Sequence, residues 1–374
     1  MIVLRILVFA LGSAIVFLTL RSAIRTFLVP RALQAHLSRA VFVTVRRVFW
    51  LRANHRHDYV RRDKVMAFYA PVSLLALLIV WLTLVIAGYA GMFWGLERVS
   101  WSRAVTLAGS SLFTLGFARG DGIISALLAF TAAAIGLFLL ALLITYLPSL
   151  YSALARREAG VSKLEVRAGR PPSGVYLLQL AWIVGRLESL HGLWKSWEDW
   201  FTDVDQSHSS FPALVFFRSL HADESWVTSA GGILDGASLY VSSADVPREP
   251  EAEFMIRAGY LCLRHIADFF WIPTPHDPAP TDPISVTREE YEAACATLAE
   301  AGVPLKPDRE QAWRDFAGWR VNYDAALIGL ARLTMAPPAP WSSDRYPDGH
   351  YIPPALPWLS RHGREAGRAT RGAS

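Results

Sequence analysis

Three long apolar runs dominate the pattern of hydrophobic and polar positions along this chain. They cover residues 2–20, 66–94 and 122–146. A helix needs about 20 apolar residues to cross the hydrocarbon core of a bilayer, and the second and third runs contain no charged side chain. The hydrophobic fraction of 53% is also high for a soluble chain. The pattern therefore predicts an all-α membrane protein whose first partner is the lipid bilayer.

The N-terminal run contains one charge, Arg5, near enough to its end to reach the membrane interface. The run has no small-residue cleavage site ahead of a polar start, as a signal peptide would have, and it leads directly into Arg21. We therefore expect an uncleaved transmembrane helix at residues 2–20. A signal peptide and a segment lying on the membrane surface are the alternatives that remain open.

The connection between the first two runs is strongly basic. Residues 21–64 carry eleven Lys and Arg side chains against only Asp58 and Asp63, and the positive-inside rule makes such a connection cytoplasmic. The predicted protein is a multi-pass protein of the plasma (inner) membrane, with its N-terminus outside and its C-terminal domain in the cytoplasm. Residues 40–51 combine apolar side chains with paired arginines, which predicts an interfacial helix that binds anionic lipid.

A short helix and an irregular loop are predicted between the second and third runs. Residues 102–112 have helical character, and Ser100 or Ser102 can cap the start of this helix. The loop that follows belongs to the stretch Ser-Ser-Leu-Phe-Thr-Leu-Gly-Phe-Ala-Arg-Gly at positions 110–120. Irregular backbone at membrane depth must be covered by protein or water. The arrangement therefore indicates a re-entrant loop in a closed oligomer.

Within this stretch, Thr114-Leu-Gly-Phe117 resembles the Thr-Val/Leu-Gly-Tyr/Phe-Gly filter of tetrameric potassium channels. The resemblance is to the two-transmembrane-helix (ion transport 2 type) potassium channel family, and it covers roughly residues 66–153. It implies a potassium-channel-like helix, pore loop and helix module that forms a homotetramer and conducts K⁺ passively. It implies no cofactor and no metal beyond the permeant K⁺ at the filter.

The resemblance also implies roles for individual residues. Backbone carbonyls in such a filter replace the hydration shell of the ion, and glycine allows the backbone to turn them inward. The implied selectivity filter is Thr114, Leu115, Gly116, Phe117 and Ala118, supported by Ser110 and Ser111. On the returning helix, Gly136 is either a close-packing position or a gating hinge.

The outer mouth departs from the family pattern. Ala118 replaces the second glycine, and Arg119 replaces the usual acidic residue. A methyl group at a left-handed position costs roughly 1 kcal/mol, and a ring of arginines opposes cation flow. Asp121 is placed to supply the outer negative charge. The alternative function is accordingly a non-conducting or poorly selective receptor or scaffold that keeps the pore fold.

The composition changes after residue 174, where Trp, Asp and Glu become frequent. We expect a helical cytoplasmic domain with helices at 175–201, from Pro212, at 224–242 and at 251–271. Capping-box patterns at Thr287 and Asp308 open further helices that end near 301 and 335, and Pro148 ends the third apolar helix. The predicted domains are a transmembrane helix (1–20), a basic cytoplasmic connection with an interfacial helix (21–64), an ion-channel pore module (65–153), a linker (154–174), the helical domain (175–336) and a Pro-rich, basic, partly disordered tail (337–374).

Candidate chemistry in the C-terminal domain is sparse. His208, His221, Asp223 and Glu224 lie near one another in sequence, but zinc spacings such as His-Glu-x-x-His or Cys-x-x-Cys are missing. We expect no metal site, no enzyme activity and no nucleic-acid partner. A membrane-tethered enzyme that uses His208, His221 and Asp223 is the weaker alternative.

The other polar residues of this domain are given structural roles. His265 and Asp268 are one helical turn apart and are interpreted as satisfied polar positions. Cys262 and Cys295 should be unpaired core residues in a reducing compartment. Arg218 with Asp223 or Glu224, and Arg320 with Asp324, are expected as surface or interface ion pairs.

Overall fold

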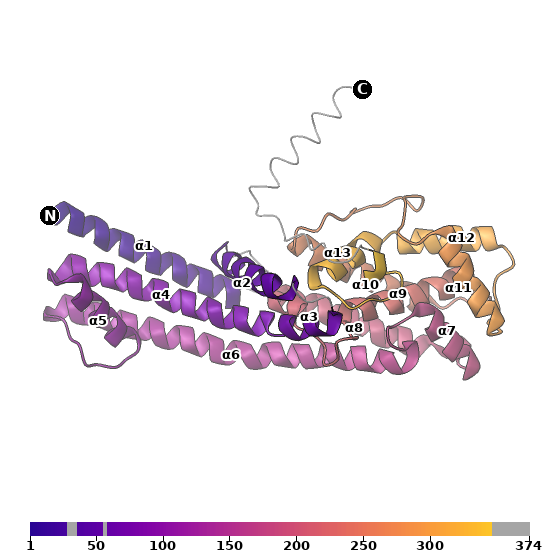
Figure 1. The fold of residues 1–374 in the computed structure, drawn as a ribbon, viewed down its shortest axis with the longest axis horizontal. Helices are drawn as coiled ribbons and strands as arrows, with labels where there is room; N and C mark the ends of the chain where they lie inside the picture. The colour runs from indigo at the N-terminus through magenta and orange to yellow at the C-terminus, as the bar shows by residue number, and fades with distance from the viewer. Residues whose placement is uncertain (28–35, 55–57, 346–374) are drawn as a thin grey trace, which may run out of the picture. The chain divides into compact units, whose positions relative to one another are not determined.

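The computed structural model describes residues 1–27, 36–54 and 58–345 (Figure 1). Within these ranges every regular element is a helix, and the β pairing is limited to an isolated bridge between Ala244 and Leu305. Three helical stretches are long and apolar enough to cross a membrane: Ile2–Phe27, Tyr59–Glu97 and Gly122–Ala168. The prediction of an all-helical, multi-pass membrane protein is confirmed at this level.

The chain folds as two compact units. The first, called the bundle unit here, comprises Met1–Arg52, Val65–Leu154 and Ser209–Phe217. The second, called the helical unit, contains Ala53–Lys64, Ala155–His208 and the chain from Arg218 onward. Residues 346–374, which include most of the predicted tail, lie outside the described residues, as do 28–35 and 55–57.

In the bundle unit, α1 (Ile2–Phe27) lies along α4 (Tyr69–Glu97) (Figure 1). Small residues bring the two backbones together: a Cβ added to Gly88 would lie 2.8 Å from the carbonyl oxygen of Gly12. Helices in lipid gain no hydrophobic driving force for association, so close packing at small residues stabilises their contact instead. The predicted N-terminal helix therefore exists and is seven residues longer than predicted.

Two shorter helices and one long helix complete the bundle unit. The predicted interfacial segment lies within α2 (His36–Asn54), and α5 (Trp101–Leu112) folds back against α4. The long helix α6 (Gly122–Ala168) contributes to the same core. This core buries aromatic and aliphatic side chains of α4, α5 and α6, among them Leu77, Trp81, Tyr89, Phe93, Leu107, Leu112 and Leu139.

The predicted end of the third apolar helix at Pro148 is wrong. α6 continues through Pro148 to Ala168, a length of 47 residues or about 70 Å. Proline removes one backbone hydrogen bond from a helix interior. The helix nevertheless resumes, because the next 20 residues are rich in helix-forming Leu, Ala, Arg, Glu and Lys. Residues 154–168, which we assigned to a linker, are therefore helical.

A short segment from the predicted C-terminal domain belongs to the bundle unit. Pro212 opens only a five-residue 3₁₀ helix, η2 (Pro212–Phe216), instead of a longer α-helix. The ring of Phe211 lies 5.2 Å from Tyr146 of α6, and the ring of Phe216 lies 5.2 Å from Tyr69 of α4. These aromatic contacts bring the segment against α4 and α6.

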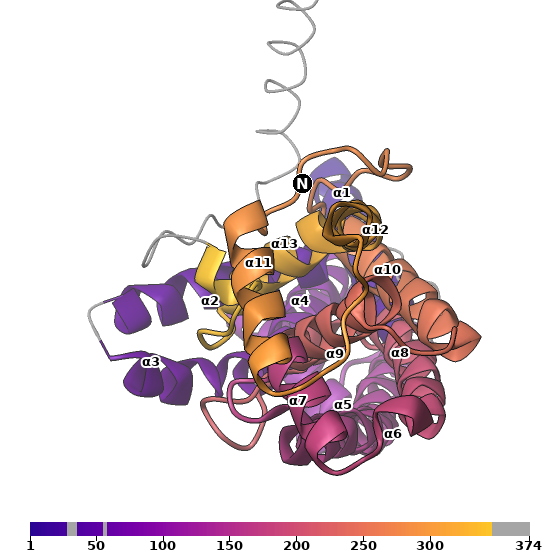
Figure 2. The same cartoon turned by 90° about the vertical axis from the view of Figure 1, so that its right-hand side faces the viewer.

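The helical unit is built around α9 (Trp226–Ser243), whose residues are all buried except Val241. The helices α7 (Gly174–Ile183), α10 (Pro250–Phe269), α12 (Arg309–Arg320) and α13 (Asp324–Thr334) pack against it (Figure 2). Small side chains in α9 make room for these neighbours. A Cβ on Gly236, for example, would lie 2.8 Å from a methyl carbon of Leu177.

The helix boundaries of this unit agree with the sequence prediction in some places only. The predicted single helix at 175–201 is wrong: Gly185 adopts a left-handed φ of 64° and ends α7, and η1 (Leu187–Ser189) and α8 (His191–Ser210) follow. The capping box of Thr287 and Glu290 is confirmed at the start of α11 (Arg288–Glu300). Asp308 caps α12, but the helix expected to run to 335 is divided into α12 and α13.

Candidate functional site

The loop between α5 and α6 starts from a well-defined helix. The Ser100 hydroxyl accepts a hydrogen bond from the Arg103 backbone N–H at 3.3 Å and so caps the start of α5. Of the two predicted cap residues, Ser100 and Ser102, the first is therefore the one used. The other end of α5 rests on α6 at Gly136, where an added Cβ would collide with the carbonyl oxygen of Leu112. Gly136 is thus a close-packing position that seats the end of α5.

The loop backbone is bonded to the last turn of α5. The Ser110 carbonyl accepts hydrogen bonds from the N–H groups of Leu115 at 2.9 Å and Gly116 at 3.5 Å. The Ser111 carbonyl accepts one from the Thr114 N–H at 3.0 Å. The buried Ser110 hydroxyl accepts a fourth from the Ala118 N–H at 3.1 Å. Four loop N–H groups therefore point toward α5.

The direction of these N–H groups fixes the direction of four carbonyls. In a planar trans peptide the N–H and the preceding C=O point in opposite directions. The carbonyl groups of Phe113, Thr114, Leu115 and Phe117 consequently point away from α5. The Phe113 carbonyl accepts from the Thr114 hydroxyl at 2.7 Å, and the Ala118 carbonyl accepts from the buried Ser110 hydroxyl at 3.4 Å. Leu115 and Phe117 are 62% and 70% exposed.

Two residues of the loop have left-handed backbone conformations. Gly116 has a φ of 73°, and Thr114 has a φ of 56°. Such a conformation is strained for a β-branched residue. The strain that we expected at Ala118 is not present, because Ala118 has no left-handed φ and is buried against Ser110. The prediction of strain at this position is therefore wrong.

Three side chains from neighbouring elements lie at the C-terminal end of the loop. The Arg103 guanidinium donates to the Arg119 carbonyl at 3.2 Å. The Ser125 hydroxyl donates to the Glu97 carboxylate, and both groups line the space beside Gly120, so that no side chain fits there. Sequence reasoning missed Glu97, although a single carboxylate at the end of an apolar run is a signal that could have identified it. Arg119 and Asp121 are exposed.

Of the four residues considered as a site from the sequence, Asp223 and Glu224 both pair with Arg170, at 3.9 and 2.6 Å, whereas His208 lies beside a different arginine. His208 is buried, with Nε2 3.4 Å from the Arg157 guanidinium and its ring 5.0 Å from Trp226. Burial, assisted by the charge of Arg157, lowers the pKa of His208 well below its usual value. His265 pairs with Asp205 at 3.0 Å rather than with Asp268.

The expected ion pairs are also rearranged. Arg218 pairs with Asp63 at 3.2 Å, whereas Glu224 pairs with Arg170 at 2.6 Å. The predicted pair of Arg320 with Asp324 forms at 2.8 Å, but Arg320 is fully buried and not at the surface.

The fully buried Arg320 also contacts Asp235 of α9. Burial raises the pKa of Asp235, and Arg320 partly offsets this effect. Cys262 and Cys295 are buried and unpaired, as predicted.

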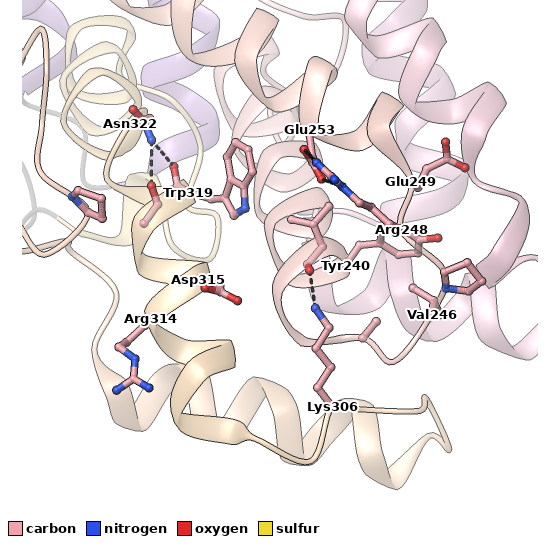
Figure 3. A pocket seen from close by; sticks show the side chains of 15 residues that line it. Tyr240, Val246, Arg248, Glu249, Glu253, Lys306, Arg314, Asp315, Trp319 and Asn322 are labelled. Atoms are coloured by element: carbon pink, nitrogen blue, oxygen red, sulfur yellow. Dashed lines mark hydrogen bonds and ion pairs between the residues drawn. The ribbon is translucent and has the colours of Figure 1, made fainter.

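The helical unit also contains a pocket of about 560 Å³ (Figure 3). Its walls come from the end of α9, the connection to α10, α12 and the segment around Lys306. Lys306 donates to the Val241 carbonyl at 2.8 Å, and Arg248 pairs with Glu253 at 2.8 Å. The charged and aromatic lining residues are Tyr240, Arg248, Glu249, Glu253, Lys306, Arg314, Asp315 and Trp319.

No family model, curated protein or solved structure matches this chain. The loop and the pocket are therefore interpreted from their own chemistry.

Proposed function

We propose that the chain is a subunit of a passive cation channel, with K⁺ as the permeant ion and residues 114–118 as the selectivity filter. The observation that carries the proposal is the set of three filter carbonyls, those of Thr114, Leu115 and Phe117, directed away from α5. Carbonyl oxygens in such a row can replace the hydration shell of a cation. The resemblance of Thr114-Leu-Gly-Phe117 to the potassium-channel filter supports the same ion.

The exposure of the loop supports a homotetramer. Leu115 and Phe117 are mostly exposed in one chain, and uncovered polar backbone is not tolerated at membrane depth. Three further copies around a common axis would cover the loop and complete the ring of carbonyls. The exposed apolar side chains along α6 fit contacts with lipid or with a neighbouring subunit: Ile123, Ile124, Leu127, Phe130, Leu137, Leu140 and Ile144.

The proposed orientation places the N-terminus outside and the helical unit in the cytoplasm. The basic residues of the connection support it through the positive-inside rule. On α2, Arg47 and Arg52 are exposed beside exposed Val48 and Leu51, which suits an interfacial helix on anionic lipid. Arg46 is instead buried over the rings of Tyr69 and Phe216.

A second candidate function rests on Arg119. This residue is exposed at the outer end of the loop, and four copies around an axis would repel cations. A non-conducting or poorly selective pore-fold receptor or scaffold is the function that this feature favours.

Ion flux into liposomes tests both candidates. Purified tetramers would be reconstituted with a K⁺ or a Na⁺ gradient, and wild type would be compared with Gly116→Ala, which places a methyl group at a left-handed φ of 73°. Gly192→Ala is the matched control, because an added Cβ there meets open space. We expect K⁺ flux in wild type and the control, and its loss in Gly116→Ala.

The other outcomes select between the candidates. Equal K⁺ and Na⁺ flux would indicate a poorly selective pore. No flux from intact tetramers, in wild type and also after opening mutations in α6, would favour the receptor or scaffold.

A further inference from the structure

Three side chains with metal-binding atoms meet where α8 and α10 begin. His191 is the first residue of α8, Glu249 is the N-cap residue of α10, and Glu251 lies in the first turn of α10. The Nδ1 atom of His191 is 3.2 Å from a carboxylate oxygen of Glu249 and 3.5 Å from one of Glu251. All three ligand atoms lie within 4.8 Å of one another.

The spacing of these atoms fits the coordination shell of one ion. Zinc binds His nitrogen and carboxylate oxygen at about 2.0–2.2 Å, so two ligands of a tetrahedral site lie about 3.3–3.5 Å apart. The two distances from His191 fall near this value. A neutral imidazole and two carboxylates carry a charge of −2, which one divalent cation neutralises.

The Glu249 and Glu251 carboxyl groups face the same His191 nitrogen, with ligand atoms within 4.8 Å of one another. The nearest candidate counter-charge in sequence, Arg248, is held by Glu253 through hydrogen bonds of 2.8 and 2.9 Å. Arg248 is therefore engaged outside the cluster.

One residue of the cluster borders the pocket of the helical unit. Glu249 lines the pocket of about 560 Å³ and lies at its edge (Figure 3). A tetrahedral ion with three protein ligands keeps a fourth position for water or another small molecule.

We propose that His191, Glu249 and Glu251 bind a divalent transition-metal ion, with Zn²⁺ as the best fit. The imidazole ligand favours Zn²⁺ over Mg²⁺ and Ca²⁺, which prefer all-oxygen sites. The ion ties the start of α8 to the start of α10. The site is independent of the proposed channel activity, and its test uses no flux measurement.

Calorimetric titration of the full-length protein tests the site. The protein would be kept in detergent, freed of any affinity tag and treated with a chelator before titration with Zn²⁺ or Mg²⁺. We expect one Zn²⁺ per chain in wild type and no comparable binding of Mg²⁺. His191→Gln and Glu251→Gln should each weaken Zn²⁺ binding at least about tenfold, the lower end of what even outer-shell changes produce.

His265→Gln is the matched control. His265 is as exposed as His191 and makes the same type of contact with a single carboxylate, Asp205. Its Zn²⁺ affinity should equal that of wild type. Zn²⁺ should also raise the melting temperature of wild type and of His265→Gln, but not that of His191→Gln.

Three outcomes would overturn the site. They are the absence of Zn²⁺ binding to wild type, equal binding by wild type and both ligand variants, and loss of binding in His265→Gln. If His191→Gln fails to fold, Glu251→Gln decides the question, because Glu251 is partly exposed on the first turn of its helix.

Discussion

The hydroxyl of Ser125, in the first turn of α6, donates a hydrogen bond to the carboxylate of Glu97 at the end of α4. This bond joins the two long helices that flank the loop. Gly120 lies directly beside it, with no space for a side chain. The last residues of the loop are therefore held by a charged group that belongs to neither α5 nor the loop itself.

Removing this bond should destabilise the bundle unit. Ser125→Ala leaves the Glu97 carboxylate without the hydroxyl, and a hydrogen bond to a charged group contributes about 1.5–3 kcal/mol. We expect a lower melting temperature of the full-length protein and a smaller ratio of K⁺ to Na⁺ flux. Ser149→Ala, which removes an exposed serine on the same helix that bonds only to the Thr145 carbonyl, should change neither quantity. Equal melting temperatures of the two variants would contradict the role given to Glu97.

The contact between α1 and α4 should be sensitive to a single methyl group. An added Cβ at Gly88 would lie 2.7 Å from a methyl carbon of Val16 and 2.8 Å from the Gly12 carbonyl. Overpacking of this kind costs about 1–3 kcal/mol, so Gly88→Ala should lower the melting temperature and weaken cross-linking between cysteines placed in α1 and α4.

Gly91→Ala is the comparison for that experiment, because its added Cβ stays 3.4 Å from Val8, an ordinary contact. Equal behaviour of the two variants would mean that α1 adjusts its position freely on α4.

The buried Arg320 should be among the most sensitive positions of the helical unit. Arg320→Met leaves the carboxylates of Asp235 and Asp324 without their cation, and breaking a buried ion pair from one side costs about 3–5 kcal/mol. Arg314→Met, on the same helix but exposed, should change stability little. Thermal unfolding of the full-length variants, followed by circular dichroism, measures the difference. A similar loss in both variants would show that the buried charges are not responsible.

His208 should make stability depend on pH. Its folded pKa is well below the usual value because of burial and the nearby Arg157, which itself pairs with Glu158. The unfolded chain therefore binds a proton near pH 6.5 while the folded chain does not. The contribution of neutral His208 to the free energy of unfolding is complete above that pH. As the pH falls further this contribution is lost, and the free energy of unfolding decreases with a slope approaching about 1.4 kcal/mol per pH unit.

Unfolding measured between pH 7 and pH 5 tests this effect. His208→Gln cannot take up the proton and should show a shallower loss of stability than wild type. Gly192→Ala should keep the wild-type slope, since it changes no titratable group and its added Cβ meets open space. Parallel curves for wild type and His208→Gln would contradict a buried neutral His208.

The sequence predicted the features that depend on local composition. Apolar runs long enough to cross a bilayer identified the three long helices. The caps at Ser100 and Thr287 were predictable because their side chains bond to backbone N–H groups three residues away. Pro148 failed as a stop signal because helix-forming residues on both sides outweigh one missing hydrogen bond. Gly185 was overlooked because the apolar periodicity continues on either side of it.

The site residues that the sequence analysis did not identify are held by contacts between residues far apart in the chain. Glu97 and Ser125 are 28 positions apart, and His191 is 58 positions from Glu249. No short spacing connects such pairs, so motif searches cannot find them. The sequence analysis predicted Arg320 at the surface because its contact with Asp235, 85 positions away, could not be seen in the sequence.

The almost complete burial of α9 has a consequence for how this sequence can change over evolutionary time. Nearly every face of the helix touches a neighbour, and its small residues leave no space for larger ones. Substitutions should therefore accumulate more slowly here than on the exposed helices. We expect distant homologues to share the spacing of Gly231, Gly232, Asp235 and Gly236, even where the rest of the helical unit has diverged beyond recognition.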